Sequence, residues 1–93
     1  MKTLLLITSL LLTASVAHSA ELVLGDAAKG KQLHNRDCVA CHDSSVYTRP
    51  NRIKSLSGLE KRVQMCSGML NKGYTEDDQA NIVKFLNDTY YKF

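Results

Sequence analysis

The sequence predicts a small all-α domain, and three observations lead to this prediction. Three segments have helix caps or apolar residues at helical spacing. No segment shows the regular alternation of apolar and polar residues that is typical of a half-buried strand. Only one proline occurs among the 93 residues, so little interrupts the helices. The composition, 44% hydrophobic and 6% aromatic, is too apolar for a disordered chain, and the length is too short for two domains.

Residues 1–19 have the pattern of an export signal that is cleaved. Lys2 provides a positive start, residues 4–16 form a mostly apolar run, and Ala17 and Ser19 place small side chains before the cut. A run of this length is too short to cross a bilayer, which takes about 20 apolar residues, so a retained anchor is the less favoured alternative. We therefore expect a periplasmic domain of residues 20–93 without a transmembrane segment.

A mature chain of 74 residues needs more than its own core. It buries only about 60% of its unfolded surface, and chains of this size usually depend on disulfides, a metal or a cofactor. The three cysteines can make one disulfide at most, and Cys38 and Cys41 are too close in sequence to close a useful loop. Another group must complete the core.

Residues 38–42, Cys-Val-Ala-Cys-His, form the C-x-x-C-H signature of covalent haem attachment. Two thiols on one helical turn can each bond a vinyl group of the same porphyrin, and the following imidazole can bind the iron. The sequence thus predicts one haem c, with thioethers from Cys38 and Cys41 and with His42 as the proximal axial ligand. A thioredoxin-like pair would need a βαβ pattern, and a zinc site would need a second paired motif.

Residues 25–34, together with the C-x-x-C-H motif, resemble the N-terminal helix of class I monohaem cytochromes c. The resemblance implies a small cytochrome c fold of three main helices around one covalently bound haem c. It also implies that Gly30 lets the C-terminal helix cross closely, beside the aromatic Phe85. At the family's aromatic position this chain has His34, for which we expect packing or a hydrogen bond at the crossing rather than iron binding.

Capping and periodicity place the helices. The first is expected from Ala27 to Asn35 with Asp26 as its N-cap, followed after the haem motif by a loop over residues 43–54. The second is expected to begin at Ser57 in a capping box with Glu60 and to give way to a loop near Gly68. The third is expected to open at Thr75, followed by three acids. The apolar stripes are Leu59, Val63, Cys66 and Leu70, and then Gln79, Ile82, Val83, Leu86 and Tyr90.

The resemblance also implies the distal ligand of the iron. The family's axial methionine commonly lies in a loop about six residues before the cap of the last helix, which corresponds to Met69. Met65 is expected inside the second helix, in the core or the wall of the haem pocket. Met65, Asn71, a lysine or a vacant position remain as alternatives. The carbonyl of Pro50 is a candidate acceptor for the Nδ1–H of His42, with an ordinary turn proline as the alternative.

Cys66 has no partner once Cys38 and Cys41 bind haem. A small buried side chain is the first interpretation, and an intermolecular disulfide in an otherwise monomeric protein and a thiolate on iron are the alternatives. Tyr90, Tyr91 and Phe93 are expected to pack the C-terminus against the core.

The mature chain lacks Lys2 and therefore has a net charge of +2. This is well short of the strong positive charge that is typical of nucleic-acid-binding proteins. Basic side chains nevertheless gather in one stretch, which could dock an acidic redox partner, form a solvated face, or pair with haem propionates. They are Arg49, Arg52, Lys54, Lys61 and Arg62.

The resemblance implies an electron carrier rather than an enzyme. We expect single electrons to pass between redox partners through His/Met-ligated haem iron. The alternatives are a protein that binds O2, NO or CO at a labile sixth position, and an electron-transfer subunit of a larger redox complex.

Overall fold

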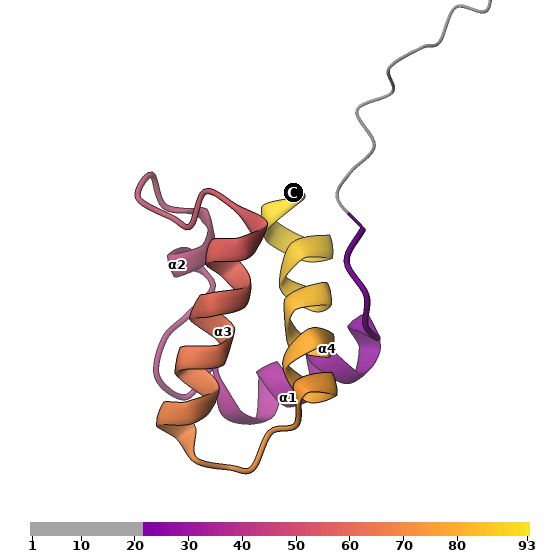
Figure 1. The fold of residues 1–93 in the computed structure, drawn as a ribbon. Coiled ribbons are helices and arrows are strands. Elements are labelled where there is room, and N and C mark those ends of the chain that lie inside the picture. The colour runs from indigo at the N-terminus through magenta and orange to yellow at the C-terminus, as the bar shows by residue number, and fades with distance from the viewer. Residues whose placement is uncertain (1–21) are drawn as a thin grey trace, which may run out of the picture.

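The computed structural model describes residues 22–93, so the predicted export signal lies outside the described residues. All regular secondary structure among the described residues is helical, with no strand, which confirms the all-α class. Figure 1 shows α3 and α4 as an antiparallel pair, with α1 crossing the N-terminal half of α4. The elements are α1 (Ala27–Asp37), α2 (Ser45–Thr48), α3 (Leu56–Leu70), α4 (Glu76–Leu86) and a π-helical turn, η1 (Asn87–Tyr91).

Helix α1 begins where the sequence predicts and ends two residues later. The side chain of Asp26 accepts hydrogen bonds from the backbone N–H groups of Ala28 and Lys29, at 2.9 and 3.1 Å. At the other end, the N–H of Cys38 donates to the carbonyl of His34 at 2.9 Å. The helix therefore runs directly into the C-x-x-C-H motif and fixes where that motif starts.

The close crossing of α1 and α4 is confirmed. A Cβ atom placed on Gly30 would lie 1.9 Å from the carbonyl oxygen of Asn81, a distance that no real Cβ tolerates. Phe85 is buried beside this contact, with its ring centroid 5.1 Å from that of His34. Gly30 thus permits the two backbones to touch, and α1 and α4 form the most extensive helix pair of the described chain.

The expected loop over residues 43–54 contains a short helix, α2, that the sequence analysis missed. Its four residues are too few to show a hydrophobic period. Tyr47 on this turn is buried in the core, and its hydroxyl pairs with Nε2 of His34 at 2.7 Å. Residues that follow the haem motif are thereby tied back to α1.

The predicted boundaries of α3 are wrong at both ends. The N-cap is Ser55, whose hydroxyl accepts from the N–H of Gly58 at 3.0 Å, so Ser57 lies inside the helix. The third helical residue is Gly58 rather than a glutamate, so no capping box forms. The helix also continues past Gly68 to Leu70 and ends at Asn71, which adopts the left-handed conformation with φ of 50°.

Helix α4 has the predicted start and continues into η1. Thr75 and Asp78 form a reciprocal capping box, at 3.1 and 3.0 Å. In η1 the N–H of Lys92 donates to the carbonyl of Asn87 at 2.8 Å, a five-residue spacing that widens the last turn. This turn buries Tyr91, and Tyr90 and Phe93 pack beside it, as expected of the C-terminus. The buried hydrophobic residues are Tyr47, Leu59, Val63, Ile82, Val83, Phe85, Leu86 and Tyr91.

The helices leave a gap in the middle of the fold. Both α1 and α3 pack on α4, whereas α1 and α3 make few contacts with each other. None of the described helices is long and apolar enough to cross a membrane.

Candidate functional site

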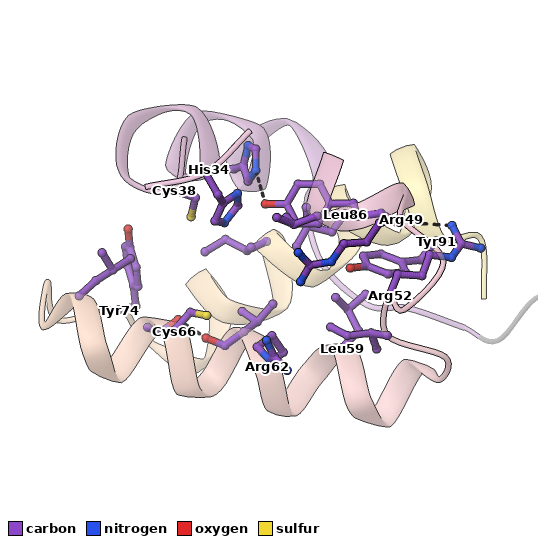
Figure 2. Close-up of a pocket in the computed structure, with 18 of the residues that line it drawn as sticks. His34, Cys38, Arg49, Arg52, Leu59, Arg62, Cys66, Tyr74, Leu86 and Tyr91 are labelled. Atoms are coloured by element: carbon purple, nitrogen blue, oxygen red, sulfur yellow. Dashed lines mark hydrogen bonds between the residues drawn. The ribbon is translucent and has the colours of Figure 1, made fainter. Parts of the chain in front are cut away.

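A cavity of about 270 Å³ lies between the C-terminal end of α1, α2 and α3 (Figure 2). Its wall combines apolar side chains with two thiols, two imidazoles and three guanidinium groups, a mixture suited to a large apolar group with anionic substituents. Lining residues include Cys38, His42, Val46, Ile53, Leu59, Val63, Cys66, Leu70, Ile82 and Leu86, with Arg49, Arg52 and Arg62.

The two cysteines of the C-x-x-C-H motif take different positions. Cys38 lines the cavity, and its thiol pKa is raised by burial and then by the neighbouring charges of Asp37, Cys66 and Cys41. Cys41 is exposed, and its N–H approaches the carbonyl of Cys38 at 3.4 Å in a single turn. Both cysteines are free thiols: Cys38 lies in the cavity wall, and Cys41, three residues later, lies on the surface.

His42 lines the same cavity, and its hydrogen bond selects the tautomer. Its Nδ1 lies 3.0 Å from the backbone carbonyl of Asp43. A carbonyl can only accept, so Nδ1 carries a proton, and in the neutral imidazole this leaves the lone pair that a metal ion requires on Nε2. This is the second-sphere arrangement typical of a metal-binding histidine.

The acceptor is therefore the carbonyl of Asp43, whereas the sequence analysis named that of Pro50 as a candidate beside the alternative of an ordinary turn proline. Pro50 is exposed, does not line the cavity, and accepts from Nζ of Lys54 at 2.9 Å. The structure does not bring Pro50 and His42 together, which agrees with the alternative of an ordinary turn proline. A carbonyl one residue after the histidine has no sequence signature, so this contact could not be predicted.

His34 behaves as predicted. It is only 4% exposed, it packs on Phe85, and its Nε2 is engaged by the hydroxyl of Tyr47. Burial also raises the pKa of Tyr47, so this tyrosine stays protonated. The pair forms a fixed polar contact behind the cavity.

The five basic residues have different surroundings. Arg49, Arg52 and Arg62 line the cavity, and the guanidinium of Arg52 lies 5.7 Å from the ring centroid of Tyr91. Lys54 binds the Pro50 carbonyl, and Lys61 lines a separate groove beside the N-terminal segment. The structure thus brings three of them to the wall of one cavity.

Helix α3 presents Cys66 to the cavity, whereas both methionines lie outside it. Met65 is 52% exposed and Met69 is 77% exposed, and neither lines the cavity. The expectation that Met65 belongs to the core or the pocket wall is wrong. Met69 lies in the last turn of α3 rather than in a loop, because the helix does not end at Gly68. Cys66 is exposed rather than buried, which overturns its first interpretation.

A buried carboxylate precedes the haem motif and was missed by the sequence analysis. The side chain of Asp37 is fully buried, and Arg36 binds it through Nε and Nη2, with the shortest contact at 2.6 Å. Lys72 binds it at 3.1 Å, and the hydroxyl of Tyr74 donates to it. These contacts join the end of α1 to the α3–α4 loop and hold the pKa of Asp37 well below its ordinary value.

We expect Asp37→Asn to lower the thermal midpoint by several degrees at pH 7. The folded protein holds the pKa of Asp37 below 3.8, so its ionised form stabilises the fold. This stabilisation is complete above pH 3.8 and is lost as the pH falls below that value. The measurement is thermal unfolding at pH 7 and at pH 3. The difference in thermal midpoint between wild type and Asp37→Asn should be smaller at pH 3 than at pH 7.

Asp88→Asn is the matched control, because Asp88 pairs with Lys84 at 3.0 Å on the exposed surface and should contribute little. Equal midpoints for wild type and Asp37→Asn at pH 7 would contradict the assigned role.

No three His, Cys, Asp or Glu side chains of residues 22–93 cluster closely enough to hold a bare metal ion. A haem needs fewer protein ligands, because the porphyrin supplies four nitrogens to its iron. Comparison of the chain with protein-family models, with curated proteins and with solved structures finds no match.

Proposed function

We propose that this chain is an exported monohaem c-type cytochrome of the class I kind, which carries single electrons between redox partners. The observation that supports this most is the shared cavity: a thiol, an imidazole with a free Nε2 and three arginines surround an apolar interior, next to a C-x-x-C-H motif. The residues present therefore fit a haem.

Cys38 and Cys41 would hold the group covalently. Each S–H adds across one vinyl C=C, with sulfur bonding to one carbon and hydrogen to the other, so no oxidant or reductant is consumed. Both thiols are free, as this addition requires. With Cys38 inside the cavity and Cys41 on the surface, the two thioethers would fix one edge of the ring at the entrance.

His42 would bind the iron through Nε2, with Asp43 keeping the imidazole in the required tautomer. Arg49, Arg52 and Arg62 offer guanidinium donors that suit two propionate carboxylates. When bound, the haem supplies a one-electron Fe(III)/Fe(II) couple. The volume of about 270 Å³ is below that of most ligand sites, so part of a bound haem would remain outside the cavity, where redox partners could reach it.

The alternative of a gas-binding protein is favoured by one observation, the absence of either methionine from the cavity wall. An iron without a strong distal ligand would take up CO when reduced. The electron carrier and the gas-binding protein thus differ in how strongly a protein side chain would bind the sixth coordination position of the iron.

The test is expression of the full chain in cells that attach haem c, followed by mass spectrometry and absorption spectra. We expect a mass increase of one haem and a low-spin spectrum when oxidised. A mass equal to that of the bare processed peptide would contradict haem binding. A high-spin oxidised spectrum with immediate CO binding after reduction would favour the gas-binding alternative.

A further inference from the structure

We propose that Cys66 is the residue that binds the haem iron on the face opposite His42. This inference rests on the proposed function, because it names the distal ligand of the same site. It replaces the methionine that the sequence analysis favoured.

The position of Cys66 on α3 is the first argument. The helix turns its residues at three- and four-residue spacing to the cavity, and Cys66 lies in the middle of that face. Figure 2 shows Cys66 on the wall formed by α3 and Cys38 on the wall formed by the end of α1, with both sulfur atoms directed into the space between them. A group bound covalently to Cys38 would therefore have Cys66 on the other wall of the cavity. The cavity-facing residues of α3 are Leu59, Arg62, Val63, Cys66, Ser67 and Leu70.

The second argument is that three other polar side chains of the wall, those of Ser67, His34 and Tyr74, are already hydrogen-bonded. The hydroxyl of Ser67 donates to the carbonyl of Val63 at 2.6 Å, and Nε2 of His34 pairs with Tyr47 at 2.7 Å. Tyr74 donates to the carboxylate of Asp37. The guanidinium groups stay protonated and have no lone pair to offer. Among the cavity-lining residues of α3, Cys66 has a free sulfur.

The third argument is the placement of the methionines. Met69 would have to leave the exposed face of α3, which requires the last turn of the helix to unwind. That turn is capped by Asn71 and followed by Lys72 and Tyr74, both bound to Asp37. Cys66 reaches the cavity without any change of the backbone.

The chemistry of binding is simple. The thiol releases its proton to solvent and the sulfur binds as a thiolate, with no change of oxidation state. An anionic thiolate donates electron density and stabilises Fe(III) relative to Fe(II), whereas a neutral thioether favours Fe(II). Cys66 would thus make the protein a carrier of low reduction potential.

The experiment compares Cys66→Ser and Cys66→Met with Met69→Ala as the matched control, all in the haem-loaded full chain. We expect wild type and Met69→Ala to share the electron paramagnetic resonance signature of a low-spin thiolate-ligated Fe(III). Cys66→Ser should lose that signature and become high-spin. Cys66→Met should have a higher reduction potential than wild type.

Alkylation provides an independent readout. Bound to iron, Cys66 should resist iodoacetamide in the folded oxidised protein and react fully after denaturation. A low-spin spectrum that survives in Cys66→Ser and is lost in Met69→Ala would overturn the inference, as would rapid alkylation or a Cys66 disulfide dimer on a non-reducing gel. In these outcomes haem remains attached, so the proposed function stands; a chain without haem contradicts both.

Discussion

Gly30→Ala is expected to abolish the compact fold or leave it barely populated. The added methyl group would lie 1.9 Å from the carbonyl oxygen of Asn81 and 2.9 Å from the N–H nitrogen of Ile82. These are backbone atoms of α4, so no side-chain rotation relieves the overlap, and the two helices must separate. Overpacking alone costs roughly 1–3 kcal/mol, and separating the largest helix interface adds to it. A domain of this size is stable by only about 4–10 kcal/mol.

The measurement is the thermal or urea unfolding of both proteins, followed by circular dichroism. Gly68→Ala is the matched control, because Gly68 also lies inside a helix and a Cβ there would meet nothing within 4 Å. Alanine is the better helix former by about 1 kcal/mol, so this variant should gain stability. If Gly30→Ala unfolds at the same temperature and urea concentration as wild type, the fold does not depend on a glycine at this crossing.

Local signals in the sequence predicted much of the fold. Asp26 and Thr75 cap their helices as expected, because a capping side chain bonds backbone N–H groups two or three residues away. The close crossing at Gly30 was expected from the resemblance to class I cytochromes c, and the need of a glycine inside a helix for a packing reason agrees with it. The predicted start of α3 was wrong because Ser55 and Ser57 can both act as an N-cap. Which of them does so depends on where the backbone first becomes helical, and in the structure this is at Leu56.

The site was less predictable than the fold. The C-x-x-C-H motif is contiguous, so Cys38, Cys41 and His42 could be named directly. The Asp43 carbonyl and the carboxylate of Asp37 escaped notice because backbone acceptors have no sequence signature and because Asp37 meets partners 35 and 37 residues away. Helical spacing had already placed Cys66 on one stripe with Leu59, Val63 and Leu70, and all four line the cavity. That this stripe faces a cavity rather than a closed core depends on how α3 packs against distant helices, which no local pattern encodes.

Replacing both motif cysteines, as Cys38→Ala with Cys41→Ala, is expected to remove the covalent haem and most of the cooperative fold. The described core has only eight buried hydrophobic residues. A cavity lies between α1 and α3, which make few contacts with each other. Without haem, these two helices would be held together only through their packing on α4. In a chain of this size a single hydrophobic core rarely supplies more than about 3–5 kcal/mol, so losing an added stabilising group has a large effect. We therefore expect no haem in the denatured chain, weaker helical circular dichroism, and broad, shallow melting.

Cys66→Ser is the control for this variant, because it also removes a thiol from the cavity wall but leaves both thioethers in place. It should keep one haem per chain after denaturation in acid and acetone, and should retain cooperative unfolding. A double variant that remains colourless yet melts as sharply and at the same temperature as wild type would show that α4 alone suffices to hold α1 and α3. The cavity would then be a binding site within an independently stable domain, and the haem would serve electron transfer without stabilising the fold.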